Sequence, residues 1–326
     1  MRRIFFFLFL LFSLSLPLNA EAQYTPDSVY TAARAGQLEK VQAKLGKTKN
    51  QTILNNTLGA AVVGNRPEII KFLVQRGADP NHLSSFNSPL LNNAIMYGFA
   101  ESALALIDAG ANVEMRGFRR IAYNLTIEYN WTPLMCAAWT GNEKIVQSLL
   151  DHGADPTEKG WSTGPDDIET SADVAAYAGH LNILKLLLKK GVPISPATIF
   201  KTVRGGHLDT LKYLLKKDKD INLIGPYHKT LLMEASWWGY PEIVKYLLRK
   251  GADVKQVGDD GQTALIAVVS NTGLRQKTQY EIAQLLIRKG INVNARGKNN
   301  LTALQLAERY NHKDLIQLLE KSGAKN

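Results

Sequence analysis

Apolar residues recur along the chain in short runs with helical spacing. Five such runs are IIKFLVQR, IVQSLLDH, ILKLLLKK, IVKYLLRK and IAQLLIRK. In each run the apolar side chains fall near positions i, i+3 and i+4, which predicts a short amphipathic helix with one buried face. A glycine follows each run directly, and glycine commonly ends a helix because it adopts the left-handed conformation without strain.

These glycines open a second recurring pattern. The pattern reads GADPN at Gly77, GANVE at Gly110, GADPT at Gly153, GVPIS at Gly191, GADVK at Gly251 and GINVN at Gly290, with DKDIN at 218–222 as a version without glycine and Gly323 closing the series. The interval from Gly77 to Gly110 is 33 residues, as is that from Gly290 to Gly323. A fixed period of this length indicates stacked repeats, because one unit is too small to bury its apolar face alone.

Another motif precedes several of the apolar runs and predicts a further short helix. It reads WTPLMCAAWTGN from Trp131, KTLLMEASWWGY from Lys229, QTALIAVVSNTG from Gln262 and LTALQLAERYNH from Leu301. Thr132 and Thr230 are suited to cap this helix, and Pro133 suits its first position. Gly141 and Gly239 are expected to allow the tight turn into the next helix.

Together the two motifs resemble the ankyrin repeat, whose pattern is a T-P-L-H-x-A-A segment, a glycine, a leucine-rich helix and G-A-D-V-N. The resemblance extends over nearly the whole chain after residue 22. It implies an all-α ankyrin-repeat solenoid of about eight or nine helix-turn-helix repeats with β-hairpin loops. The first unit, TAARAGQLEKV from Thr31, and the last are degenerate and are expected to act as caps.

Three segments depart from the repeat. Alternating large and polar residues predict a hairpin-like insertion at about 117–130. An acidic loop insertion is expected at about 157–169, and the segment 272–277 is expected to enlarge a turn between two helices.

The first residues have the order of an export signal. Arg2 and Arg3 precede an apolar run from Ile4 to Leu16, and Ala20-Glu21-Ala22 matches a cleavage site. The sequence therefore predicts a signal peptide at 1–22 and an ankyrin-repeat domain at 23–326. An uncleaved membrane anchor is the alternative. We expect a bacterial protein that is periplasmic or secreted and does not insert into a membrane once the signal is removed.

Charge and cysteine content add two constraints. The formal net charge is +10, and the single cysteine, Cys136, excludes an intramolecular disulfide. Basic pairs at the ends of the leucine-rich helices complement the helix dipole, so the charge does not by itself require nucleic acid. Export would also separate the protein from nucleic acid, so we expect no nucleic-acid partner. An acidic face on a protein partner is the attractor that the charge favours.

No catalytic motif is present in the sequence. His180, His207 and His312 follow the glycine between helices, or its equivalent, and are expected to be structural, while the other histidines have no metal-ligand spacing. Asp166, Asp167 and Glu169 are expected to lie in a solvated loop, with cation binding as the alternative. The sequence implies no cofactor and no metal.

Aromatic residues gather at one position of the repeat. The resemblance places the two residues before the inter-helix glycine on the concave face of the solenoid. In eight repeats these positions hold sixteen residues, of which six are aromatic, whereas the chain is 8% aromatic overall. The predicted partner-binding residues are Tyr97, Trp139, Tyr177, Trp237, Trp238, Arg309 and Tyr310. Protein-binding surfaces use such rings as anchors. The alternative is that the rings pack as core between neighbouring helices.

We therefore expect a monomeric, non-enzymatic scaffold that binds a protein through its concave face and hairpin tips. A periplasmic inhibitor or immunity protein that caps a toxic enzyme is one role compatible with this expectation. The competing class is an enzyme built on a degenerate repeat array.

Overall fold

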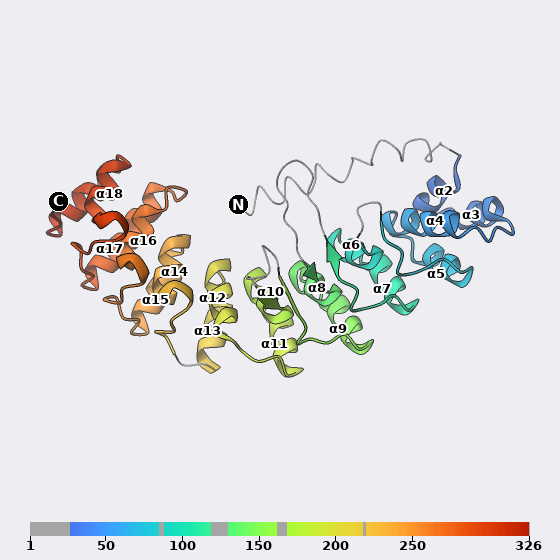
Figure 1. Cartoon of the computed structure of the whole chain (residues 1–326), viewed down its shortest axis with the longest axis horizontal. Coiled ribbons are helices and arrows are strands. Elements are labelled where there is room, and N and C mark those ends of the chain that lie inside the picture. The colour runs from blue at the N-terminus through green and yellow to red at the C-terminus, as the bar shows by residue number, and fades with distance from the viewer. Residues whose placement is uncertain (1–26, 85–87, 119–129, 162–167, 218–219, 326) are drawn as a thin grey trace. The chain divides into compact units, whose positions relative to one another are not determined.

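The computed structural model describes residues 27–84, 88–118, 130–161, 168–217 and 220–325 (Figure 1). Within these residues the chain is built from pairs of short helices that form two compact units. Unit 1 contains the described residues up to Asp155 together with Gly160–Ile168, and unit 2 contains Pro156–Lys159 and the residues from Glu169 onward. The predicted signal peptide lies outside the described residues.

Unit 1 contains four helix pairs in its described part. The first helices of the pairs are α2 (Val29–Ala35), α4 (Gln51–Val63), α6 (Leu90–Met96) and α8 (Pro133–Thr140). The second helices are α3 (Leu38–Leu45), α5 (Pro67–Gln75), α7 (Ala100–Asp108) and α9 (Glu143–Asp151).

Unit 2 contains five pairs in the part of the chain that the structure describes. The first helices are α10 (Ser171–Ala178), α12 (Pro196–Gly205), α14 (Leu231–Trp238), α16 (Ala264–Ser270) and α18 (Ala303–Arg309). The second helices are α11 (Leu181–Lys189), α13 (Leu208–Lys217), α15 (Pro241–Arg249), α17 (Gln276–Arg288) and α19 (Lys313–Lys321). Three hairpin turns connect the four successive pairs from α12/α13 to α18/α19. They contain the short 3-10 segments η3 (Pro226–His228), η4 (Asp259–Gly261) and η5 (Lys298–Asn300). The predicted all-α solenoid architecture is confirmed.

The helix ends follow the predicted chemistry. The Thr132 and Thr230 hydroxyls accept hydrogen bonds from the backbone N–H groups of Met135 and Met233, and Pro133 occupies the first position of α8. The inter-helix glycines Gly141 and Gly239 are left-handed, at φ 80° and 73°. The repeat motif therefore sets each helix boundary locally.

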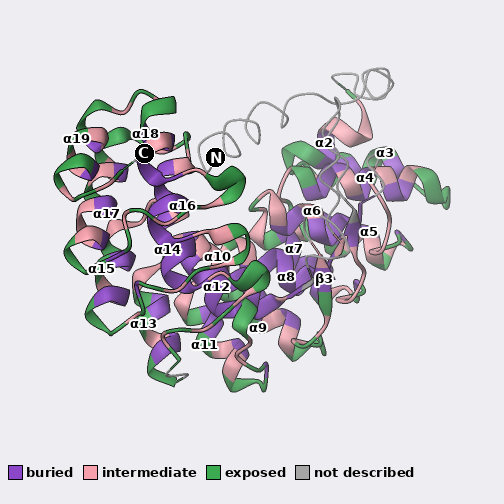
Figure 2. Ribbon diagram, turned by 60° about the vertical axis from the view of Figure 1, so that its left-hand side comes forward, coloured by how far each residue is buried: buried purple, intermediate pink, exposed green. Residues whose placement is uncertain are grey.

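First helices are buried on nearly every side, whereas second helices bury one stripe (Figure 2). In α14 six of eight residues are buried, and in α15 the buried residues are Ile243, Val244, Leu247 and Leu248. This difference follows from the small residues of the first helices, which lie between both neighbours, and from the amphipathic spacing of the second helices.

Neighbouring repeats are also joined by hydrogen bonds at equivalent positions. In unit 1 the Asn112 backbone N–H donates to Asn81 Oδ1 at 2.7 Å, and in unit 2 the Asp253 N–H donates to Asn222 Oδ1 at 2.8 Å. The last carbonyls of the first helices are satisfied from the next repeat: Asn271 Nδ2 donates to Trp237 O at 2.6 Å. Each repeat thus depends on its neighbour for polar as well as apolar contacts.

The insertions are described at their ends. The strands β1 (Gly117–Phe118) and β2 (Asn130–Trp131) pair antiparallel, with Gly117 opposite Trp131, and residues 119–129 lie outside the described part. The strands β3 (Lys159–Trp161) and β4 (Ile168–Thr170) form a second sheet, and residues 162–167 are likewise outside. The third insertion lengthens helix α17 as well as the turn before it, because α17 begins at Gln276.

Candidate protein-interaction site

The predicted binding residues of unit 1 lie at the ends of two first helices. Tyr97 is the C-cap of α6, is half-buried, and has its ring centroid 6.0 Å from that of Phe99. Trp139 lies near the end of α8, is half-buried, and packs 5.7 Å from the buried Trp131. Each ring therefore packs on one side and meets solvent on another.

The predicted residues of unit 2 occupy the same position of the repeat. Tyr177 lies near the end of α10, and Trp237 and Trp238 are the last two residues of α14; all three are half-buried. At the last repeat Arg309 ends α18 and is exposed, while the half-buried Tyr310 is its C-cap. The two tryptophans are neither fully buried, as core residues would be, nor fully exposed. Their role as binding residues therefore stays a prediction.

A buried carboxylate holds one of these tryptophans in place. Glu234, one helical turn before Trp238, is 4% exposed. Its Oε1 atom accepts a hydrogen bond of 2.9 Å from the Trp238 indole Nε1 and one of 2.8 Å from Arg204 Nε. Because the Arg204 side chain is 38% exposed, the guanidinium reaches from the buried carboxylate to solvent. This Arg204–Glu234–Trp238 cluster fixes a tryptophan and an arginine, two residue types enriched at binding hot spots.

A second ion pair is buried in the same unit. Lys201 Nζ lies 2.9 Å from Glu169 Oε2, with side-chain exposures of 11% and 4%. Glu169 therefore corrects the expectation that it lies in a solvated loop or binds a cation, because it is buried and paired with an ammonium group. Asp166 and Asp167 lie outside the described residues.

The hairpin turns of unit 2 expose residues that the sequence analysis did not single out. Ile224 and Val257 are each 52% exposed, and Tyr227 is 73% exposed. Tyr227 and His228 have φ angles of 59° and 47°, whereas the equivalent left-handed positions of the next repeat hold Asp260 and Gly261. Tyrosine is poorly suited to this conformation. Alignment of the repeats would have shown that an aromatic residue replaces a turn-forming one here.

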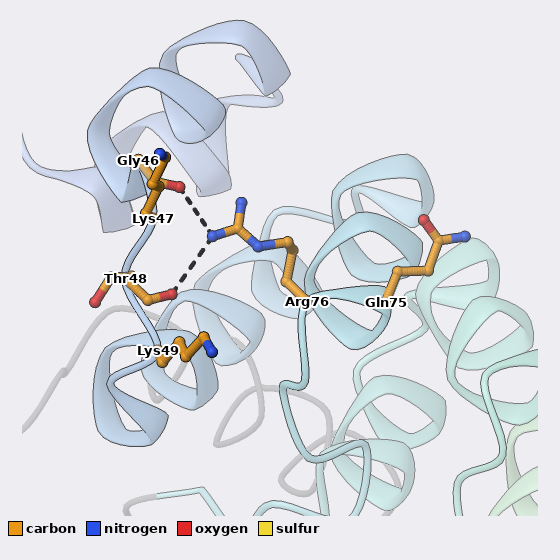
Figure 3. A pocket seen from close by; sticks show the side chains of 6 residues that line it. All are labelled: Gly46, Lys47, Thr48, Lys49, Gln75 and Arg76. Atoms are coloured by element: carbon orange, nitrogen blue, oxygen red, sulfur yellow. Dashed lines mark hydrogen bonds between the residues drawn. The ribbon is translucent and has the colours of Figure 1, made fainter.

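A depression lies between the loop at 46–49 and the end of α5 in unit 1, with a volume of about 430 Å³ (Figure 3). Its walls include Lys47, Lys49 and Arg76. The Arg76 guanidinium donates to the backbone carbonyls of Gly46 at 2.9 Å and Thr48 at 3.4 Å. Arg76 therefore serves to hold the loop, and the depression is a weaker candidate than the aromatic positions.

Reactive groups are few in the described residues. Burial raises the pKa of the Cys136 thiol to about 12, so this cysteine stays protonated and unreactive in the folded protein. Across the described ranges, no group of three or more His, Cys, Asp or Glu is arranged to hold a metal ion. None of the helices searched in those ranges is both long and apolar enough to cross a bilayer.

Comparison with known proteins agrees with the fold. The family described as ankyrin repeats (3 copies) matches residues 58–160, 172–258 and 254–326, and that described as ankyrin repeats (many copies) matches 141–188. Because these matches span most of the chain, the protein belongs to the ankyrin-repeat family. Ankyrin repeats generally mediate protein–protein interaction, and the fold is typically non-enzymatic.

The curated relatives are much longer proteins. The chain is 30% identical over 124 residues to glycerophosphocholine phosphodiesterase gde1 of Schizosaccharomyces pombe, which is 37% of this chain and 9% of that protein. It is 29% identical over 179 residues to transient receptor potential cation channel subfamily A member 1 of Homo sapiens, 50% of this chain and 14% of the channel. It is 28% identical over 284 residues to ankyrin repeat and KH domain-containing protein mask-1 of Caenorhabditis elegans, 82% of this chain and 10% of that protein.

Among solved structures, an ankyrin repeat domain from Acinetobacter baumannii AYE is similar, with a TM-score of 0.47 and 24% identity. The match covers 59% of this chain and 98% of that domain. All of these likenesses concern the repeats and leave the partner of this chain to be inferred from its own residues.

Proposed function

We propose that the protein is a non-enzymatic scaffold that binds a partner protein through the first helices and hairpin tips, with the strongest anchor in unit 2. The Arg204–Glu234–Trp238 cluster carries the proposal. A buried carboxylate is costly unless it is paired, and here both of its partners are side chains that extend toward solvent. Glu234 holds Trp238 and Arg204 in one conformation before a partner binds. The two side chains therefore lose less conformational entropy on binding, which strengthens it.

The hairpin tips supply the second contact. Tyr227 is held in an unfavourable backbone conformation while its side chain is 73% exposed. Strained residues are found preferentially at functional sites. The contact of the exposed Tyr227 ring with the Lys229 ammonium, 5.8 Å from its centroid, is too weak to justify the strain. The interface would then include both the ends of the first helices and the hairpin tips.

We further propose that the protein acts outside the cytoplasm, as an inhibitor or immunity protein that caps an enzyme. The order of Arg2, Arg3, the apolar run and Ala20-Glu21-Ala22 supports export. Intact-mass measurement of the native protein tests this part: a mass that begins at Gln23 is expected, and a mass that retains the apolar run in the membrane fraction contradicts it.

Affinity capture from the native compartment tests the binding function. The wild type should retain a specific partner, and Trp237→Ala with Trp238→Ala should weaken that binding by about thirtyfold or more, as the loss of an interface anchor does. Tyr246→Ala, at a half-buried position on the second helix α15, is the matched control. Thermal melts must show that the double variant remains folded.

Two results would contradict the proposal. Equal losses of binding in the double variant and in the Tyr246 control would mean that the tryptophans do not form the interface. A reproducible activity of the purified protein in a hydrolase screen, abolished by a single substitution, would favour the alternative of an enzyme on a degenerate array.

A further inference from the structure

The second helices of unit 2 carry a large surplus of positive charge. Counted with the C-cap residues of α11, α15, α17 and α19, they hold 14 basic and 5 acidic side chains, all of them exposed. The basic residues are Lys185, Lys189, Lys190, Lys212, Lys216, Lys217, Lys245, Arg249, Lys250, Lys277, Arg288, Lys289, Lys313 and Lys321. The acidic residues are Asp209, Glu242, Glu281, Asp314 and Glu320.

The second helices of unit 1 have no such surplus. Counted in the same way, α3, α5, α7 and α9 hold 5 basic and 6 acidic side chains. The positive charge of the chain is therefore not spread evenly over the repeats, and on the second helices of unit 2 it forms a basic face.

The ends of the helices show the difference at one position. The last residue of every second helix in unit 2 is basic: Lys189, Lys217, Arg249, Arg288 and Lys321. In unit 1 the last residues are Leu45, Gln75, Asp108 and Asp151. The helix dipole favours a cation at this position in both units alike, so it does not account for the contrast.

The composition of the basic face indicates the kind of partner. Of its 14 basic residues 12 are lysine, and protein interfaces are depleted in lysine and enriched in arginine and aromatic residues. The described exposed large apolar residues, Val63, Ile224, Tyr227 and Val257, all lie outside these helices. The Tyr213 ring has the ammonium groups of Lys185 and Lys217 at 5.3 and 5.6 Å, so it offers no open platform on which a nucleic-acid base would stack.

We propose that this basic face binds the surface of an anionic lipid membrane through the phosphate groups of the lipids. Clusters of exposed lysine attract such surfaces without inserting into them. The export expected from the sequence brings the protein next to a membrane rather than to nucleic acid. The proposal goes beyond the partner-binding function and does not depend on it, because the first helices and the hairpin tips remain available to a protein.

Sedimentation with vesicles tests the proposal on the native full-length protein. One set of vesicles contains phosphatidylcholine alone, and the other contains about 30 mol% phosphatidylglycerol, which supplies a negative surface potential. The test variant combines Lys189→Gln, Arg249→Gln, Arg288→Gln and Lys321→Gln. The matched control combines Lys40→Gln, Lys47→Gln, Lys71→Gln and Lys144→Gln, four exposed lysines of unit 1. Both variants lose four positive charges. Both also keep the apolar N-terminal segment, so any effect of that segment on membrane binding is the same in the two.

The wild type and the control should bind the anionic vesicles, and the test variant should bind at least about tenfold more weakly, since each lysine near a charged surface contributes separately. Raising the salt to about 0.5 M should release the wild type, because it shortens the screening length. Three results overturn the proposal: no preference for anionic vesicles, equal weakening in both variants, or tighter binding to a DNA duplex that displaces the protein from the vesicles. Thermal melts of both variants confirm that they are folded.

Discussion

The two units contain the same kind of helix pair but differ in the polar side chains that they bury. In the described part of the chain the buried charged residues are Glu169, Asp173, Lys201 and Glu234, and all four belong to unit 2. The first helices of unit 1 bury neutral groups instead, such as Asn55, Thr57 and Asn92. Since the described repeats of unit 1 form without buried charged side chains, the helix pair does not require buried charge. The Arg204–Glu234 pair, which holds an arginine and a tryptophan that reach solvent, is therefore better explained by the orientation of surface side chains than by stability.

Breaking the most buried ion pair should have the largest effect. Lys201→Met leaves the Glu169 carboxylate buried without its ammonium partner, which should lower the free energy of unfolding by about 3–5 kcal/mol. The double variant with Glu169→Met should recover much of this loss, because it removes the uncompensated charge. Urea denaturation measures both.

Lys212→Met is the control for that prediction. Lys212 lies 3.0 Å from Asp209 in an exposed pair, and its loss should cost less than about 1 kcal/mol. Equal costs for Lys201 and Lys212, or no recovery in the double variant, would contradict the difference between buried and exposed pairs.

Close contact between first helices should be equally sensitive in both units. A Cβ atom at Gly205 would lie 2.1 Å from the carbonyl oxygen of Tyr177, and one at Gly64 would lie 2.3 Å from that of Arg34. Gly205→Ala and Gly64→Ala should each cost about 1–3 kcal/mol through overpacking. At Gly59 the nearest atom is 3.9 Å away, so Gly59→Ala should be neutral or stabilising. Melting temperatures that fall for Gly59→Ala as well would refute the packing explanation.

The hairpin turns allow a stabilising substitution in unit 2. Tyr227→Asn places at φ 59° the residue type that occupies the equivalent position, Asn299, in a later repeat. Relief of left-handed strain should raise the free energy of unfolding by about 1 kcal/mol. The same substitution should weaken partner binding if the tip is part of the interface. A melting temperature that falls would show that Tyr227 stabilises the fold.

The smallest predicted effect concerns pH and unit 1. Burial lowers the pKa of His82, while the charge of Asp79 acts in the opposite direction. Between the lowered folded pKa and the ordinary value of about 6.5, the unfolded chain binds more protons than the folded one. This contribution to stability is therefore full above the ordinary pKa and declines as the pH falls below it. His82→Gln should flatten the pH dependence of unfolding between about pH 7 and pH 5, and a wild-type slope that persists in the variant would contradict this.

The sequence predicted the helix pairs well because each is determined locally. A threonine cap, small residues, a left-handed glycine and an amphipathic run all occur within one period of 33 residues. The buried ion pairs were not predicted because their members lie in different repeats: Lys201 is 32 residues from Glu169, and Arg204 is 30 residues from Glu234. A charged residue inside an otherwise small and apolar first helix, such as Glu234 in LLMEASWW, was the available indication.

The position of the aromatic residues was predicted, but not how they are held. Their common place before the inter-helix glycine follows from the repeat, whereas the hydrogen bond from Trp238 to Glu234 depends on rotamers that a pattern of residue types does not specify. Tyr227 was missed because its hairpin turn reads as an ordinary loop unless it is aligned with the turns at Asp260 and Asn299.

The account rests on the claim that the buried Glu234 carboxylate serves binding rather than folding, and Glu234→Gln tests it most directly. Glutamine keeps the shape of the side chain and an acceptor for the Trp238 indole, and it leaves no buried carboxylate. The Arg204 side chain is 38% exposed, so its guanidinium can be solvated without this partner. Affinity for the captured partner and the free energy of unfolding are measured on the same preparation. We predict a change in unfolding of less than about 1 kcal/mol and a loss of partner affinity of about tenfold or more. Unchanged affinity, or a loss of stability large enough to account for the lost binding, would contradict the claim.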